Sequence, residues 1–278
     1  ALSKVPLVIS LTETINESSD KSNFVLPVNT MFESWGDFQT RNNFYSLQQP
    51  VIAPLYNTRQ KEEIMLTWSK GTKDAFNNEI YQKYVMDNWK AGALQGAGSD
   101  ANFMKQWYAA LNDGVVSTKT VSAAEENSPT SFKSEAVTSS NSKLIQSNET
   151  VLILLKSSSL GDGRFANNGW LQELPKPLSR IVWDNYAAIS VQTAKAMSLN
   201  SNDIIKVTTS AGSIEVPVFI QPGTAEGVIA VELGYGRNVC GTVGKDVGVN
   251  ANKMMSKNSK VSQWMFNDAK IEKTGSVY

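Results

Sequence analysis

The alternation of apolar and polar positions divides the chain into a mixed front part, a polar middle and a strand-rich back part. In the front part, Val5–Leu11 predicts a buried strand and Phe24–Leu26 a second short strand, and residues 12–20 between them predict a short helix. This order is typical of an α/β sheet with parallel strands. Two strands are too few for such a sheet, so the other strands are expected to come from residues outside this sequence.

Helical spacing dominates the next stretch. Residues 41–56 contain Pro50 and Pro54 and predict an irregular, extended segment. Three helices are then expected, each followed by a glycine: Asn57–Ser69 with a capping box of Asn57 and Gln60, Asp74–Lys90, and Ala101–Asn112. Their aromatic stripes are far more typical of a core than of a cofactor site.

The polar middle is rich in small hydroxyl side chains. Residues 117–150 hold 9 Ser and 5 Thr. Such a composition is typical of a linker or a poorly ordered excursion. We therefore expect a first domain at 1–115, a Ser/Thr-rich linker at 116–150 and a second domain at 151–278.

The back part predicts short strands joined by tight turns. Pro217 within one strand indicates a sheet edge or a bulge. Ser190–Met197 predicts a short helix with Ser190 as its N-cap. The expected strands are Val151–Leu155, Ala187–Ile189, Ile204–Thr209, Ile214–Ile220, Val228–Leu233 and Trp264–Phe266. This arrangement is typical of a small closed β-barrel.

One loop in the back part has an unusual composition. Residues 161–177 contain three glycines and two prolines, together with Arg164, Phe165 and Trp170 and a tandem pair of asparagines. A loop between rigid strands is a common place for binding chemistry. The alternative is a lid that packs Phe165 and Trp170 onto the domain.

A second glycine-rich stretch follows the strand Val228–Leu233. Its glycines do not have the GxGxxG spacing of a strand-to-helix turn, so the dinucleotide fingerprint is absent. They would let the backbone approach a flat ligand or a phosphate, or they would serve the turns of a barrel. The spacing favours neither alternative.

Composition excludes several classes of chemistry. The 278 residues include 26 Lys and Arg against 26 Asp and Glu, so no basic surplus favours nucleic acid as a partner. The chain has no histidine and one cysteine, Cys240, which excludes a Ser-His-Asp triad, a disulfide within this chain and Cys-rich zinc or iron–sulfur sites. No apolar run approaches the roughly 18 residues of a membrane span. We predict no catalytic residue and no metal site here.

Several short motifs resemble the molybdopterin-dependent oxidoreductases of the dimethyl-sulfoxide-reductase type. They are Thr12-Glu-Thr14, Val25-Leu-Pro27, Glu33-Ser-Trp-Gly36, the segment Ser198–Val207, and Gln221-Pro-Gly223. The resemblance implies a fragment of an α/β, Rossmann-like domain followed by a double-psi β-barrel. In that family the barrel closes over a bis-pterin cofactor.

A narrower resemblance is to the large subunit of alternative complex III. It rests on Gln49–Leu55, Asp162–Pro175 and Leu233–Arg237. This implies a mainly structural part of a subunit in a respiratory, quinol-oxidising electron-transfer complex at the periplasmic side of the inner membrane. Its partners would be the rest of its own parent chain and other subunits of that membrane-bound complex, without direct membrane insertion. Iron–sulfur clusters would lie in the parent protein, outside this chain.

The resemblance also implies a site. Asn167, Asn168, Trp170, Tyr235 and Arg237 would face the cofactor cleft. If this chain is a mainly structural part of the respiratory subunit, which we call the scaffold hypothesis, it holds no cofactor and has no redox activity by itself. Under the alternative, the chain is the cofactor-binding C-terminal region of a genuine molybdopterin-dependent oxidoreductase, with molybdopterin guanine dinucleotide bound in the parent. A third hypothesis is a non-catalytic interaction domain.

Overall fold

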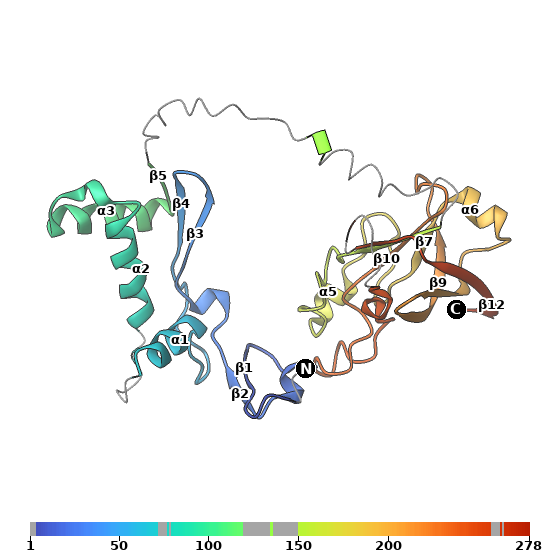
Figure 1. Cartoon of the computed structure of the whole chain (residues 1–278), viewed down its shortest axis with the longest axis horizontal. Helices are drawn as coiled ribbons and strands as arrows, with labels where there is room; N and C mark the ends of the chain where they lie inside the picture. The colour runs from blue at the N-terminus through green and yellow to red at the C-terminus, as the bar shows by residue number, and fades with distance from the viewer. Residues whose placement is uncertain are drawn as a thin grey trace. The chain divides into compact units, whose positions relative to one another are not determined.

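A computed structural model describes residues 4–71, 77, 79–118, 134–135, 150–256, 262 and 264–278. The chain forms two compact units, Ala1–Thr130 and Ser131–Tyr278, which we call the N-terminal and C-terminal units (Figure 1). Most of the predicted linker, residues 116–150, lies outside the described residues. No helix within the described ranges is both long and apolar enough to cross a membrane.

The N-terminal unit begins with a two-stranded parallel sheet. β1 (Ile9–Thr12) pairs with β2 (Phe24–Pro27), which confirms the predicted parallel pairing. β1 is half-buried at three of its four positions and β2 is mostly exposed, so the prediction that the first strand is buried was wrong. The predicted helix over 12–20 was also wrong, because the side chain of Asn16 accepts hydrogen bonds from the backbone N–H groups of Ser18 and Ser19 and forms a local turn. A single 3₁₀ turn, Ser19–Lys21, follows.

A second, antiparallel sheet holds β3 (Gly36–Arg41), β4 (Phe44–Gln48) and β5 (Val115–Ser117). Its β3–β4 hairpin corrects the prediction of an irregular segment over 41–56. The hairpin turns at Asn43, whose φ of 61° lies in the left-handed region that asparagine tolerates.

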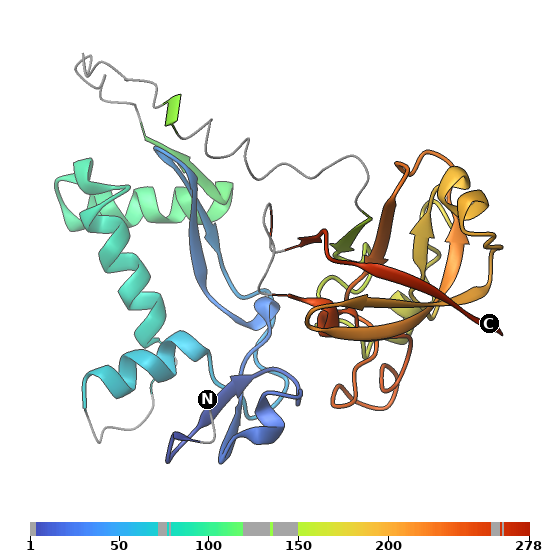
Figure 2. The ribbon, with the colours of Figure 1, turned by 45° about the vertical axis from the view of Figure 1, so that its right-hand side comes forward.

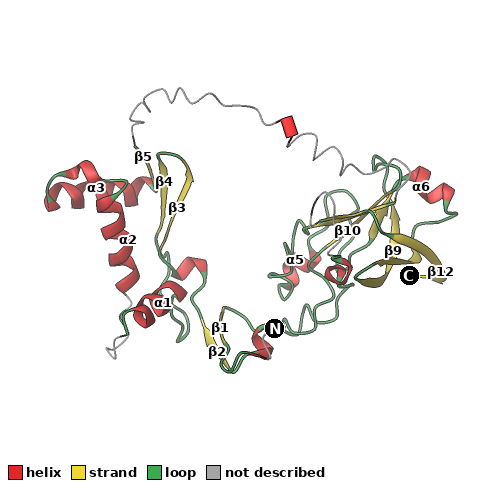
Figure 3. Ribbon diagram, in the orientation of Figure 1, coloured by secondary structure: helices red, strands yellow, loops and turns green. Residues whose placement is uncertain are grey.

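Three helices pack beside this sheet, and Figure 3 shows that the long helices of the chain belong to the N-terminal unit. They are α1 (Lys61–Ser69), α2 (Ile80–Ala91) and α3 (Asp100–Asp113). Of the predicted helix Asp74–Lys90, residues 74–76 and 78 lie outside the described residues. The capping box at Asn57 was wrong: Gln60 is the N-cap of α1, and its side-chain amide binds the backbone of Trp35 instead. The core is formed by Val85, Trp89, Leu94, Ala97, Phe103, Trp107 and Ala110.

The C-terminal unit is built on one mixed sheet of seven strands, in the order β11-β6-β10-β7-β9-β8-β12. The strands are β6 (Val151–Leu155), β7 (Ala187–Ile189), β8 (Asp203–Thr209), β9 (Gly212–Ile220), β10 (Val228–Glu232), β11 (Met265–Phe266) and β12 (Lys270–Val277). β6 pairs with β10 and β7 with β9 in parallel, and the other pairs are antiparallel. In Figure 2 the red strand β12 lies along the hairpin of β8 and β9.

Every strand predicted for this unit is confirmed. Alternation along β8 and β9 buries Ile205, Val207 and Val216 completely in the core. Pro217 stands just before the segment of β9 that β7 covers, because their register begins at Val218. β9 nevertheless lies between β7 and β8, and Pro217 is opposite Ile204 of β8, so the prediction of an edge strand was wrong. β12 was not predicted, since its sequence is mostly charged and polar and its side chains are exposed.

Two short helices complete the C-terminal unit. α6 (Val191–Ala196) is confirmed, and the Ser190 hydroxyl caps it by accepting a hydrogen bond from Thr193 N at 3.0 Å. α5 (Gly169–Glu173) interrupts the stretch predicted as a loop. The mixed sheet is consistent with a barrel-like domain, while the double-psi order and the Rossmann-like character of the first unit stay predictions.

Candidate functional site

Two long loops leave the same edge of the C-terminal sheet. β6 and β10 are adjacent and parallel, so their carboxyl ends lie together. The first loop (residues 156–186) follows β6 and the second loop (residues 233–250) follows β10. The carboxyl ends of parallel strands are where ligand sites of α/β proteins are commonly built. These two loops contain all five of the predicted site residues.

Glycines bring the backbones of the two loops into contact. A Cβ atom built at Gly244 would lie 2.3 Å from the carbonyl oxygen of Ala166, and one at Gly241 would lie 2.3 Å from the side-chain nitrogen of Asn167. No real side chain tolerates such distances. The second glycine-rich stretch therefore serves the packing of one loop on the other.

Two of the predicted site residues tie the loops together. The Asn167 side-chain oxygen accepts a hydrogen bond from Val243 N at 2.9 Å. Arg237 donates from Nη1 to Gly163 O at 2.7 Å and from Nη2 to Val239 O at 3.3 Å. Both side chains thus bind acceptors or donors of the chain itself.

The other three predicted residues have separate surroundings. Asn168 caps α5 by accepting a hydrogen bond from Leu171 N at 3.2 Å. Trp170, also on α5, is 86% exposed. Tyr235 is buried, and burial raises the pKa of its hydroxyl to about 12. The role of these five residues in lining a cofactor cleft stays a prediction.

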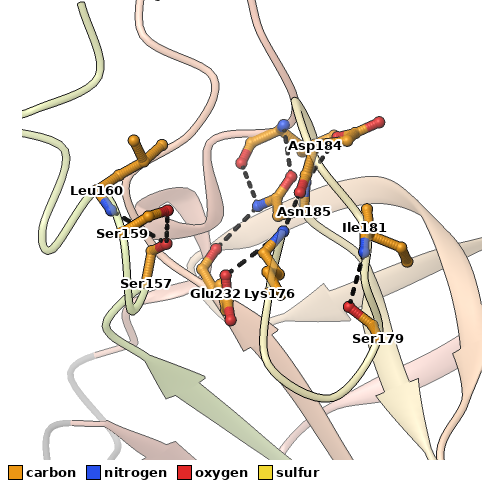
Figure 4. Close-up of polar contacts among 10 residues, drawn as sticks. Ser157, Ser159, Leu160, Lys176, Ser179, Ile181, Asp184, Asn185 and Glu232 are labelled. Atoms are coloured by element: carbon orange, nitrogen blue, oxygen red, sulfur yellow. Dashed lines mark hydrogen bonds and ion pairs between the residues drawn. The ribbon is translucent and has the colours of Figure 1, made fainter. Parts of the chain in front are cut away.

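A buried ion pair lies beneath the loops and was not foreseen from the sequence. Lys176 is 3% exposed, and its Nζ lies 3.6 Å from Oε2 of Glu232 at the end of β10 (Figure 4). The same ammonium lies 5.0 Å and 4.9 Å from the ring centres of Tyr186 and Tyr235 and donates to the carbonyl oxygen of Asp184. Burial lowers the pKa of Lys176 and raises that of Glu232, and each partner opposes the other's shift. The one signal in the sequence was a lysine between two prolines.

Asn185 is a second connecting residue that the sequence did not reveal. It is fully buried, and its Nδ2 donates to Glu232 O at 2.8 Å and to Val249 O at 2.9 Å. Its Oδ1 accepts from Val249 N at 2.9 Å. One amide therefore joins the end of the first loop to β10 and to the second loop.

The charged groups of the loops can be compared with the needs of a dinucleotide. Its phosphates would require cationic donors. Arg164 is paired with Asp162 at 3.0 Å and, by its hydrogen bond, lowers the pKa of that carboxyl to about 2. Lys176 and Arg237 are held by acceptors of the chain, whereas Lys156, Arg180 and Lys245 are exposed. Arg164, Lys176 and Arg237 therefore serve the structure of the loops themselves.

The described residues contain no cluster of three or more His, Cys, Asp or Glu side chains that could hold a metal ion.

Comparison with known proteins places these loops in a family. Residues 166–265 match the family described as the Molydopterin dinucleotide binding domain. Over 259 residues, 92% of the chain, the sequence is 22% identical to the menaquinone reductase, molybdopterin-binding-like subunit of Nitratidesulfovibrio vulgaris. The fold matches that of acetylene hydratase from Pelobacter acetylenicus with a TM-score of 0.59 over 96% of the chain, at 16% identity. Residues 166–265 thus match that domain family, and the chain resembles the C-terminal part of the molybdopterin oxidoreductases.

The chain also matches another protein over a short stretch. A tetrathionate reductase subunit of Archaeoglobus fulgidus is 33% identical over 60 residues, which is 22% of this chain and 5% of that protein. The chain spans 35% of the length of the menaquinone reductase relative and 40% of the hydratase. The family match takes in all of α5, residues 166–186 of the first loop and the whole second loop.

Proposed function

We propose that this molybdopterin oxidoreductase part serves as scaffold in a subunit of a respiratory, quinol-oxidising electron-transfer complex. The observation that carries the proposal is that two of the side chains expected to face a cofactor bind the backbone of the chain itself. Asn167 and Arg237 cross-link the two loops by hydrogen bonds. Lys176 is paired with the Glu232 carboxylate and donates a hydrogen bond to the carbonyl oxygen of Asp184. A relative named for a quinone-linked reductase, and called molybdopterin-binding-like, aligns with 92% of the chain and supports this proposal.

Exposed apolar side chains on the first loop support a role in assembly. Trp170 and Leu178 are 86% and 76% exposed, and Phe165 and Leu174 are exposed to about half. Apolar groups gathered on one segment are typical of a surface that contacts other protein. The proposed contacts are with the rest of the parent chain and with other subunits of the complex, at the periplasmic side of the inner membrane. The iron–sulfur clusters would lie elsewhere in the parent.

The family match favours one alternative function. Because residues 166–265 match a domain described by its binding of the molybdopterin dinucleotide, the parent could carry molybdopterin guanine dinucleotide in a genuine oxidoreductase. In that case Asn167, Asn168, Trp170, Tyr235 and Arg237 would line the cofactor's cleft, and the bonds of Asn167 and Arg237 would have to be exchanged for bonds to the ligand. No reaction step follows from the residues seen here.

Metal analysis of the full-length protein distinguishes the two functions. We expect less than stoichiometric molybdenum together with abundant iron. Stoichiometric molybdenum, lost in an Arg237→Ala variant and kept in a Lys195→Met variant on exposed α6, would overturn the scaffold proposal. The finer fold belongs to the same proposal, and an experimental structure lacking the double-psi strand order would contradict it.

A further inference from the structure

The buried pair of Lys176 and Glu232 joins segments that the sheet does not connect. Glu232 is the last residue of β10, and Lys176 lies in the first loop between α5 and β7. The loop makes a tight turn there, because Lys176 N donates to Ile181 O at 3.3 Å and Arg180 N donates to Lys176 O at 3.0 Å. The lysine side chain is thus fixed at the base of a turn and reaches across to the strand.

The surroundings of Lys176 and Glu232 indicate that their ion pair adds little to the stability of the folded unit. Glu232 Oε2 lies 3.6 Å from Nζ, beyond hydrogen-bond length, and finds no hydrogen-bond donor among the described residues. The facing groups are Tyr186 and Asp184 of the first loop, Tyr235 of the second loop and Ser157 after β6. In a buried pair of this kind, the electrostatic attraction is commonly smaller than the free energy lost when both charges leave water. Removal of one partner leaves the other charge buried without a counter-charge, which is strongly destabilising.

We propose that Lys176 and Glu232 form a buried latch that fixes the first loop over the end of β10 and against the second loop. The pair positions the loop and contributes little to the stability of the sheet. Asn185 lies in the segment that the latch holds, so opening would also release its bonds to Glu232 and Val249. The latch goes beyond the proposed function, because it acts whether or not the parent protein carries molybdenum.

Limited proteolysis of the full chain tests the latch. Arg180 is exposed in the turn that Lys176 closes, and trypsin does not cleave after Lys176, because Pro177 follows it. The variants are Lys176→Met, Glu232→Gln and the double variant. The matched control is Lys195→Met, because the side chain of Lys195 on α6 is exposed. Mass spectrometry measures the rate of cleavage after Arg180, and urea unfolding measures the midpoint of the C-terminal unit.

The latch predicts different outcomes for the two measurements. Each single variant should be cleaved after Arg180 roughly tenfold faster or more, since a stranded charge favours local opening. The double variant should recover the unfolding midpoint while its cleavage stays fast, and Lys195→Met should match the parent protein in both. Unchanged cleavage in the single variants, or a double variant that recovers the midpoint and slow cleavage together, would overturn the proposal. Glu232→Gln keeps the side chain's size and serves if Lys176→Met does not fold.

Discussion

The two units differ in how completely they bury their apolar side chains. The C-terminal unit has one continuous core in which Ile205, Val207 and Ile229 are fully buried between paired strands. Among the described residues, the N-terminal unit exposes more of its large apolar side chains, such as Leu55 and Tyr56 at 72% and 79%, although Trp170 and Leu178 of the C-terminal unit are exposed to 86% and 76%. Its parallel sheet has two strands, whereas parallel sheets are normally covered on both faces.

The C-terminal unit has the features of a domain that is stable by itself. A sheet of seven strands with a shared core satisfies the usual requirements for independent stability. The N-terminal unit has a compact aromatic core around Trp107 but leaves a large apolar surface beside it. Such a surface indicates contacts with other protein.

Core truncation should have the largest effect and should act on one unit at a time. Ile229→Ala and Trp107→Ala each remove a fully enclosed side chain, and each should lower the free energy of unfolding by about 4 kcal/mol. In urea unfolding of the full chain, the first variant should shift only the transition of the C-terminal unit, and the second only that of the N-terminal unit. A shift of both transitions by either variant would show that the units do not unfold separately.

The N-terminal unit should lose stability as the pH rises through neutrality. Burial raises the pKa of Glu63 to about 7 in the folded unit, above its ordinary value of 4.5. The folded state therefore holds this proton more tightly, and the stabilisation present at low pH is lost between about pH 5 and 8, by roughly 3 kcal/mol at most. Unfolding midpoints at several pH values measure the loss.

Glu63→Gln is the control for this prediction, because glutamine keeps the shape and does not titrate. Its N-terminal transition should vary less with pH than that of the parent protein. An equal pH dependence in both proteins would exclude Glu63 as the cause.

Helix capping should matter more in the C-terminal unit. The Ser190 hydroxyl is buried and accepts from Thr193 N at 3.0 Å, whereas Ser99 caps α3 through a longer, exposed bond of 3.4 Å from Asn102 N. We expect Ser190→Ala to cost about 1 kcal/mol and Ser99→Ala less. Ser213→Ala, on an exposed position of β9, controls for the loss of a hydroxyl group. Equal costs at Ser190 and Ser213 would contradict a capping role.

Exposed aromatic side chains should have the smallest effect on stability. Trp170→Ala and Tyr56→Ala remove rings that are 86% and 79% exposed, and each should change the free energy of unfolding by less than about 0.5 kcal/mol. Both variants should bind less of a hydrophobic dye than the parent protein. A large loss of stability in either variant would mean that its ring is packed in solution.

Local patterns were enough to predict most of the fold of the C-terminal unit. The alternation along β8 and β9 and the N-cap at Ser190 are properties of neighbouring residues, and they are confirmed. β12 could not be found in this way, because an edge strand with exposed faces has no apolar alternation. The hairpin at Asn43 did have a local signal, two consecutive asparagines, which the nearby prolines outweighed.

The candidate site was less predictable. The resemblance located the two loops, but it did not indicate that Asn167 and Arg237 would bind the chain itself. Lys176 and Glu232 meet only after the sheet has formed, so no spacing along the sequence links them. The same holds for Asn185, whose partners lie on β10 and in the second loop.

The parallel pairing of β6 with β10 has a consequence for synthesis of the protein. β6 lies between β10 and β11, and both neighbours follow it far along the chain, with Val228 opposite Val151 and Met265 opposite Ile153. Long-range pairing of this kind folds slowly, because a large loop must close before any contact forms. On the ribosome, β6 must therefore wait with both edges open until nearly the whole C-terminal unit has emerged. We expect this apolar strand to be the segment of the nascent chain that most needs protection from aggregation.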